Sequence, residues 1–158
     1  MCGIPFPLVK TQFLESDARF SPDGKWIAYT SNETGPWEIY IIPFNPPSED
    51  PSAATEPTRG GKWQVSTQRG WKAKWRGDGK ELFFMSGESK VTAVEIALTA
   101  NGVEIGKASP LFPVDQPAGI DPFDVSPDGE WFVENAGTAQ RSSPINLITN
   151  WDAELTQP

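Results

Sequence analysis

The stretch FSPDGKW, residues 20–26, decides the fold, because two related stretches follow it along the chain. The second copy is WRGDGKE, residues 75–81, and the third is VSPDGEW, residues 125–131. The Asp-Gly pair is present in all three copies, which recur every 50 to 55 residues. A repeat of this length is typical of an array of similar structural units.

Each copy has the chemistry of a tight turn between two strands. Pro22 has the φ angle that the second position of a type I turn needs, and Asp23 suits the third position. Gly24 takes positive φ without steric cost and forms the bulge that aligns the next strand. A ring of metal-binding carboxylates is the functional alternative, but Asp in a turn bonds its own backbone, so turn chemistry is favoured. The predicted structural turn residues are Pro22, Asp23, Gly24, Asp78, Gly79, Pro127, Asp128 and Gly129.

Short β-prone runs flank every turn, as in the stretches Trp26–Thr30, Glu81–Met85 and Trp131–Glu134. Counted along the chain, the first two units have four strands each and the last has three. The sequence therefore predicts an all-β fold of about three four-stranded antiparallel β-propeller blades, an incomplete propeller. A solenoid of hairpins is the alternative, and the strand count favours blades. The predicted boundaries are a blade-end strand at 5–13, blades at 18–67, 72–112 and 123–149, and a tail at 150–158.

Composition excludes several classes of protein. The chain has 158 residues, 11% of them aromatic, which is enough for a hydrophobic core, and its 14 Gly and 16 Pro favour short strands and turns. A net charge of −8 without clustered Lys and Arg argues against nucleic-acid binding. No apolar run is long enough to span a membrane, and the N-terminal sequence does not resemble a signal peptide.

The chemistry of catalysis and metal binding is restricted as well. The chain has no His, which excludes Ser-His-Asp and Cys-His catalysis and imidazole-based zinc sites. Cys2 is the only cysteine, so no internal disulfide is possible. We expect no catalytic residue, no cofactor and no metal. Residues 45–61, rich in Pro and small residues, are predicted to form a surface loop, with a proline-rich ligand for a partner domain as the alternative.

Three quoted segments carry a family resemblance. The segment FSPDGKWIAYTSNETGPWEIYIIPF, residues 20–44, closely resembles the Pro-Asp-containing blades of TolB-like, WD-repeat-like β-propellers. With residues 60–84 and the ending NWDAEL, residues 150–155, the chain resembles the C-terminal propeller end of bacterial receptor-type serine/threonine kinases. The resemblance implies a sensor or interaction module, extracytoplasmic or periplasmic if it belongs to such a kinase. The second turn departs from the pattern, with Arg76-Gly77 in place of Ser-Pro, and we expect it to be looser.

Three blades are fewer than the four to eight or so of a closed propeller. One interpretation is that the chain is the C-terminal part of a longer propeller. The other is that copies associate, for example as a homodimer in which the strand at 5–13 completes a blade of the partner chain. The sequence alone does not identify the oligomeric state, the ligand or the functional mouth.

Binding at one mouth of the propeller is the predicted function. The candidate binding residues lie on loops between strands and are Asn32, Glu33, Arg69, Trp71 and Glu88. Arg69 and Trp71 together suit an anionic or planar ligand, because a guanidinium pairs with anions and an indole offers a stacking face. The structural alternative is that Trp71 packs between blades while Arg69 is solvated. A propeller enzyme, such as a lactonase or the gating domain of a peptidase, is the alternative function.

Overall fold

A computed structural model describes residues 7–45, 60–99, 102–115, 121–135 and 145–148. Twelve strands and no helix lie within these ranges. Blade one consists of β1 (Glu15–Phe20), β2 (Trp26–Ser31), β3 (Glu38–Pro43) and β4 (Trp63–Gln64). Blade two consists of β5 (Gly70–Trp75), β6 (Glu81–Ser86), β7 (Lys90–Thr99), β8 (Gly102–Ile105) and β9 (Ser109–Pro113). Blade three consists of β10 (Phe123–Val125), β11 (Phe132–Asn135) and β12 (Ile145–Ile148).

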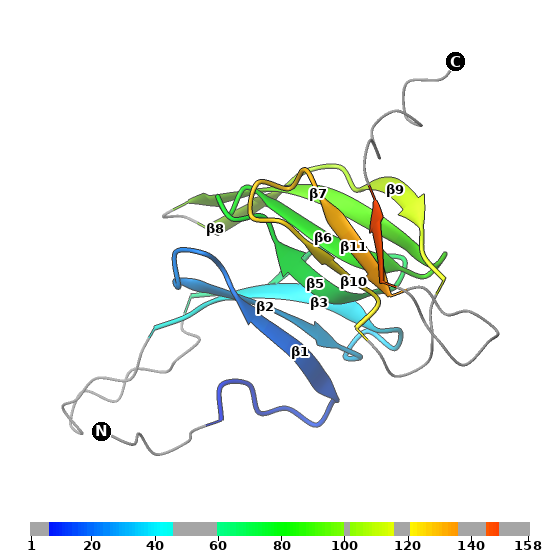
Figure 1. The fold of residues 1–158 in the computed structure, drawn as a ribbon. Coiled ribbons are helices and arrows are strands. Elements are labelled where there is room, and N and C mark those ends of the chain that lie inside the picture. Colours follow the sequence, from blue (N-terminus) through cyan, green and yellow to red (C-terminus); the bar gives the residue numbers. More distant parts are fainter. Residues whose placement is uncertain (1–6, 46–59, 100–101, 116–120, 136–144, 149–158) are drawn as a thin grey trace, which may run out of the picture.

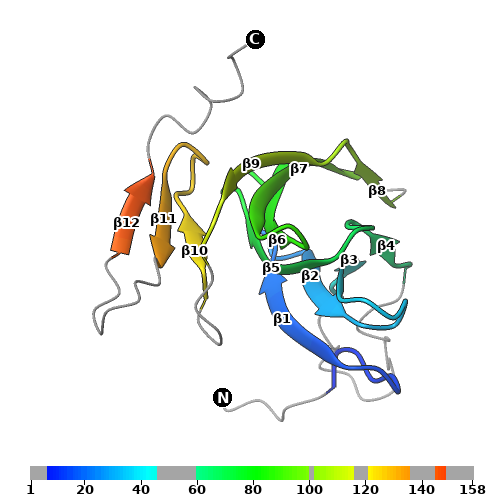
Figure 2. The same cartoon turned by 90° about the vertical axis from the view of Figure 1, so that its right-hand side faces the viewer.

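The three sheets stand side by side as blades (Figures 1 and 2). Blade one has the order β1-β2-β3-β4 and blade three the order β10-β11-β12, and every pairing is antiparallel. In blade two, β9 pairs with the first half of β7, and β8 pairs with its second half. The predicted fold class, an incomplete propeller of antiparallel blades, is confirmed.

Two sequence expectations need correction. Over its described part, the segment at 5–13 forms no strand, and the first strand begins at Glu15. Leu8 and Val9 instead pack as side chains against the apolar face of blade one, so the segment covers a sheet face rather than extending a sheet edge. The second correction concerns blade two, which has five strands instead of the expected four, because β7 continues to Thr99 and the chain doubles back as β8.

Several segments for which the sequence predicts a loop or tail lie outside the described residues. These are most of the loop at 45–61, most of the loop at 135–144, and the tail at 150–158. Within the described ranges, no helix is long and apolar enough to cross a membrane.

The three Asp-Gly turns share one geometry. Gly24, Gly79 and Gly129 have φ angles of 71°, 73° and 80°, a conformation that costs Gly little. The N–H of each Gly donates to the carbonyl oxygen three residues earlier, at 2.9 Å in all three copies. In the first turn the Asp23 carboxylate accepts from the Ser21 hydroxyl at 2.6 Å, which lowers the pKa of Asp23.

Arg76 replaces that serine in the second turn. Its guanidinium donates to both carboxylate oxygens of Asp78, at 2.8 and 2.7 Å. These bonds lower the pKa of Asp78 to about 2. The backbone hydrogen bonds of this turn match those of the other two. The expectation of a looser turn is therefore wrong for its hydrogen bonds, because a bidentate ion pair takes the place of the Ser-Asp bond.

The core lies between the blades. Successive residues of a strand point to opposite faces, so the middle blade can pack on both neighbours. Leu82 of β6 lies with Ala28 of β2 in the cluster between blades one and two. Phe83 lies with Phe132 of β11 in the cluster between blades two and three, and their ring centroids are 5.1 Å apart. This alternation stacks the sheets face to face and brings the connecting loops of neighbouring blades together.

Candidate functional site

A hollow of about 600 Å³ lies where the connecting loops of blades one and two meet. We call it the tryptophan hollow, after its two indole side chains. Its lining residues are Ser16, Asp17, Thr30, Gly35, Pro36, Trp37, Arg69 and Trp71. Arg69 and Asp17 are the charged members of this lining. The hollow thus contains two of the five residues that the sequence suggested for binding, Arg69 and Trp71.

A buried carboxylate positions Arg69. Glu38 at the start of β3 is 1% exposed, and its Oε1 accepts the backbone N–H of Arg69 at 2.9 Å. Its other oxygen accepts the hydroxyl of Ser66, and that hydroxyl in turn accepts the N–H of Ile39 at 2.9 Å. Arg69 itself has a φ of 67°, a left-handed conformation that these bonds support. The segment from blade one to blade two is therefore fixed by one side chain inside blade one.

Sequence reasoning missed this role of Glu38. The local sequence pattern gave Glu38 no particular function. A single carboxylate in an otherwise apolar strand was the available signal, because a buried charge requires hydrogen-bond partners.

The Arg69 side chain is exposed, and no ion pair engages it among the described residues. Its aliphatic part lies beside Gly87, where an added Cβ would come within 3.2 Å of the Arg69 Cβ. On its other side, Arg69 borders a smaller hollow of about 290 Å³ with Glu88 and Thr92. Arg69 thus borders both hollows, and no ion pair among the described residues neutralises its charge.

Two indoles provide the apolar part of the lining. Trp71 is half-buried and packs against the cluster between blades two and three, while it also lines the hollow. Trp37 is 38% exposed, and it belongs to the loop that leads into β3. The structural alternative, in which Trp71 packs between blades, therefore holds for part of this side chain, and the rest can contact a ligand.

Thr30 adds a buried polar group to the lining. Its hydroxyl oxygen is buried and has no hydrogen-bond partner among the described residues. An unsatisfied buried polar atom costs about 1–3 kcal/mol, so a native structure usually supplies a partner for it. The Thr30 hydroxyl oxygen has almost no accessible surface, so a ligand in the hollow does not reach it without a movement of neighbouring side chains.

The other three candidate binding residues are engaged in contacts within the chain. The Asn32 side chain accepts the Leu14 N–H at 2.9 Å. Glu33 forms an ion pair with Lys62 at 2.5 Å, and Glu88 pairs with Lys90 at 2.9 Å. The structure therefore does not place Asn32 or Glu33 in the tryptophan hollow, and Glu88 borders only the smaller one.

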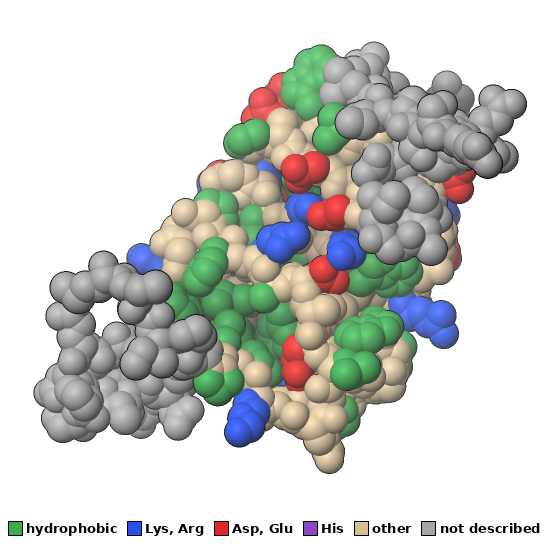
Figure 3. All heavy atoms as spheres, turned by 60° about the horizontal axis from the view of Figure 1, so that its bottom comes forward, with side chains coloured by type: hydrophobic (Ala, Val, Ile, Leu, Met, Phe, Trp, Pro, Cys, Tyr) green, Lys and Arg blue, Asp and Glu red, His purple; other side chains and the backbone are tan. Residues whose placement is uncertain are grey.

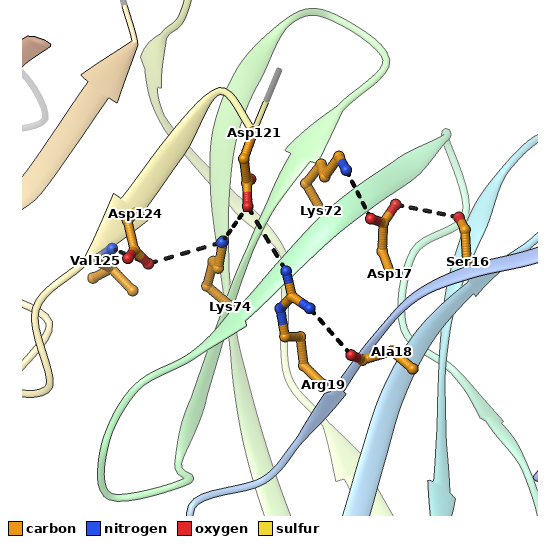
Figure 4. Close-up of polar contacts among 9 residues, drawn as sticks. All are labelled: Ser16, Asp17, Ala18, Arg19, Lys72, Lys74, Asp121, Asp124 and Val125. Atoms are coloured by element: carbon orange, nitrogen blue, oxygen red, sulfur yellow. Dashed lines mark hydrogen bonds and ion pairs between the residues drawn. The ribbon is translucent and has the colours of Figure 1, made fainter. Parts of the chain in front are cut away.

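A row of ion pairs runs along the first strands of the blades (Figure 4). Asp17 of β1 and Lys72 of β5 occupy equivalent positions of the repeat, at matching β-bulges, and pair at 2.7 Å. Asp121 accepts Lys74 at 2.7 Å and lies 3.8 Å from Arg19. Because the pairs cross from blade to blade, this row fixes the alignment of the first strands.

The charges of the row are mutually neutralised. Acidic and basic side chains lie next to one another on the face shown in Figure 3, rather than in blocks of one sign. Among the described residues, no group of three or more His, Cys, Asp or Glu side chains is arranged to hold a metal ion. The expectation that the chain uses no metal or cofactor stays a prediction.

Comparisons with known proteins identify the class of fold. No protein-family model and no curated protein matches the chain. The solved structure of TolB from Acinetobacter baumannii is 22% identical, with a TM-score of 0.59 over 84% of this chain and 29% of that one. A proposed 6-phosphogluconolactonase from Bacteroides fragilis is 14% identical, with a TM-score of 0.52 over 85% of this chain and 37% of that one.

At these identities, the likeness shows the fold alone. The chain has a TolB-like, all-β propeller fold. It spans 29% of the length of the TolB structure and 37% of the length of the Bacteroides fragilis structure.

Proposed function

We propose that this chain is a non-catalytic binding module whose tryptophan hollow takes a ligand with an anionic group and a flat apolar group. The observation that carries the proposal is the lining of the hollow. It combines the exposed side chain of Arg69 with two indoles. Sites of this kind are mostly apolar, with a few polar groups that orient the ligand.

The charges around the hollow favour an anion over a cation. Asp17 is already paired with Lys72 at 2.7 Å, whereas no ion pair engages Arg69 within the described ranges. A carboxylate on the ligand would complete a charge-assisted pair with Arg69. A ring attached to that carboxylate would pack on Trp71 or Trp37, where stacked rings contribute about 0.5–1.5 kcal/mol beyond their buried area.

A pair of matched ligands tests the proposal. We expect indole-3-carboxylate to bind about tenfold more tightly than the neutral indole-3-carboxamide, a difference of about 1.4 kcal/mol by calorimetry. Arg69→Gln should abolish this preference. Lys107→Gln removes the same charge from an exposed position outside the hollow and should leave the preference intact. Equal affinity of the native chain for both ligands, or no measurable binding, would contradict the proposal.

A second arm of the same experiment distinguishes a ligand that is a small molecule from one that is a segment of a partner protein. A short peptide with a C-terminal tryptophan carries both groups, and its amidated form lacks the charge. If the ligand is a segment of a partner protein, the free peptide should bind more tightly than the isolated indole acid. If it is a small molecule, the peptide should gain nothing over the acid.

Catalysis is the alternative function. The carboxylates nearest the loops are engaged as Asp17–Lys72 and Glu33–Lys62 pairs, which supports binding rather than acid-base chemistry. Incubation of the purified chain with a panel of sugar lactones, with and without divalent cations, tests this point. Hydrolysis above the spontaneous rate would overturn the non-catalytic assignment.

A more specific proposal concerns the protein to which this binding module belongs. We propose that the binding module is the C-terminal part of a sensor propeller, as the resemblance to receptor kinases implies. The support is that the chain spans 29% and 37% of the two solved structures described above. An in-frame kinase domain or further blades upstream in the genome would support this prediction.

A further inference from the structure

The hairpin of β7 and β8 extends past the rest of blade two (Figure 2). β6 begins at Glu81, which lies opposite Glu95 of β7, whereas β7 continues to Thr99. Over this last part, β7 pairs with β8 on one side. On its other side, where β6 lies earlier in the sheet, no strand of the described chain pairs with it. The end of β7 is therefore an edge of the sheet on this side.

The hydrogen bonds of β7 show which backbone groups lie along this edge. The Ile96 N–H donates to the Lys80 carbonyl oxygen at 2.8 Å, so Ile96 directs its N–H toward the side of β6. The Glu95 carbonyl oxygen accepts the Gly106 N–H at 2.9 Å, on the side of β8. Because this direction alternates along an antiparallel strand, Leu98 directs its N–H and C=O toward the side of β6, beyond the start of that strand. No backbone group of the described residues bonds to Leu98 on that side. We call the backbone of Leu98 on this side the open edge.

Two hollows flank the open edge. The larger one has a volume of about 800 Å³ and the smaller one about 550 Å³, and Leu98 lines both. Asp23, in the turn of blade one, also lines both hollows. All of their lining residues belong to blades one and two or to the segments between the strands of these blades. The open edge is therefore accessible within this pair of blades, whatever number of blades flanks the pair.

A segment paired with the open edge would have a different environment on each face. Residues opposite each other on paired strands point to the same face, and successive residues alternate. A residue opposite Leu98 would share the face on which Leu98 and Trp63 pack against the core between blades one and two. Its two neighbours would share the face of Glu95 and Ala97, and Glu104 lies opposite Ala97 on that face. The site thus favours an apolar residue flanked by residues that suit carboxylates.

The larger hollow has an excess of negative charge. Five carboxylates and two basic side chains are among its lining residues. One of the bases, Arg76, is already paired with Asp78 at 2.7 Å and with Glu81 at 3.0 Å. Glu95 and Glu104 are exposed, and no ion pair engages either of them in the described part of the chain. A segment with basic side chains would complement this charge.

We propose that the open edge binds an extended basic segment of a partner protein, which joins the sheet as a strand in line with β6. Backbone hydrogen bonds to Leu98 hold the segment, and its alternate side chains give specificity. Basic residues of the segment lie near Glu95 and Glu104, and the apolar residue between them lies on the face of Leu98 and Trp63. This site is separate from the tryptophan hollow, with which it shares no lining residue.

Peptides of alternating sequence test the proposal. The capped peptide Val-Lys-Val-Lys-Val should bind, and Val-Glu-Val-Glu-Val should bind at least about tenfold more weakly by calorimetry at low salt. Methylation of two valine nitrogens removes donors from the peptide edge that faces β7, and should abolish binding. Methylation of the two lysine nitrogens affects the opposite edge of the peptide and should weaken binding much less. Equal binding of the Lys and Glu peptides, equal effects of the two methylations, or no binding of the Lys peptide would each overturn the proposal.

Variants of the chain test the role of the carboxylates. The double variant Glu95→Gln and Glu104→Gln should bind the Lys peptide about tenfold more weakly than the native chain does. Asp115→Asn combined with Glu130→Gln removes the same charge from two exposed positions outside both hollows, and should bind as the native chain does. Similar affinities of the two double variants would contradict the proposed contacts.

Amide hydrogen exchange, followed by nuclear magnetic resonance, locates the peptide. In the chain alone, the Leu98 N–H should exchange faster than the Ile96 N–H, and saturation with the Lys peptide should slow it. An unchanged Leu98 exchange rate in the complex would overturn the proposal. Slow exchange of Leu98 without peptide would assign the open edge to another segment of the chain, or to a second copy if dilution reverses it, and either result would also overturn the proposal. None of these measurements depends on a ligand in the tryptophan hollow, so the two binding proposals fail separately.

Discussion

Blades two and three share the backbone geometry of the Asp-Gly turn and the antiparallel order of their first three strands, yet they differ in how much of each sheet is buried. Phe83 of blade two is 0% exposed, and the equivalent Val133 of blade three is 37% exposed. The strand alternation that defines a blade is present in both. The difference teaches that a blade's own sequence determines its sheet, while its neighbours determine which of its faces becomes core.

The largest expected effect separates the two faces of β11. Phe132→Ala should lower the free energy of unfolding by about 3–5 kcal/mol, because the ring is fully buried between blades two and three. Val133→Ala should change it by about 0.5 kcal/mol, as expected of an exposed side chain. Urea denaturation of dilute protein checks both values. Similar losses in the two variants would refute the difference between the faces.

The junction between blades one and two should be nearly as sensitive. Glu38→Ala leaves the Ser66 hydroxyl and the Arg69 N–H without their shared acceptor. We expect a loss of about 2–3 kcal/mol, because both groups lie at a largely buried site. Glu104→Ala removes a carboxylate from an exposed position of β8 and serves as the control. Equal urea midpoints for the two variants would show that the buried carboxylate is dispensable.

Contact between the turns of blades two and three gives a third test. The Gly77 N–H donates to the Pro127 carbonyl oxygen at 2.7 Å, and an added Cβ would lie 2.6 Å from that oxygen. Gly77→Pro makes the second turn resemble the other two, yet it should cost about 1–3 kcal/mol, because it removes the donor and adds a clash. Arg76→Ser introduces the serine of the other two turns and leaves the hydrogen bond between Gly77 and Pro127 in place. A stabilised Gly77→Pro chain would contradict the described packing of the turns.

The smallest expected effect is an acid sensitivity of the second turn. The Arg76 guanidinium lowers the pKa of Asp78 from 3.8 to about 2. The stabilisation from this carboxylate is therefore complete above about pH 4 and is lost as the pH falls toward 2. Thermal melting of Asp78→Asn should differ from that of the native chain at pH 5 and converge with it near pH 2. A constant difference between the two chains across this range would contradict the shifted pKa.

The sequence predicted the fold well, because the turns and the strand alternation are local properties. Pro22, Asp23 and Gly24 form a turn from their own backbone preferences, and the strands beside them alternate in period two. Repetition of the unit then indicated blades. The one unpredicted strand, β8, depends on β7 running past its sheet partner, which no local pattern marks.

The candidate site was predicted only in part, because it depends on contacts between distant segments. Arg69 and Trp71 were recognisable as a cation and an aromatic side chain close together in the sequence, and the structure places Trp71 in β5. Trp37 and Thr30 join them only when blade one packs on blade two. Asn32 looked equally suited to a ligand, but its side chain is engaged by the backbone of Leu14.

A double-mutant cycle on Phe83 and Phe132 tests the stacking of blades most directly. Their rings meet edge to face, at 5.1 Å and 88°, from different sheets. Phe83→Leu, Phe132→Leu and the double variant, compared by urea denaturation, should show a coupling energy of about 0.5–1.5 kcal/mol. A coupling of zero, with both single variants folded and destabilised, would contradict the face-to-face stack on which the tryptophan hollow depends.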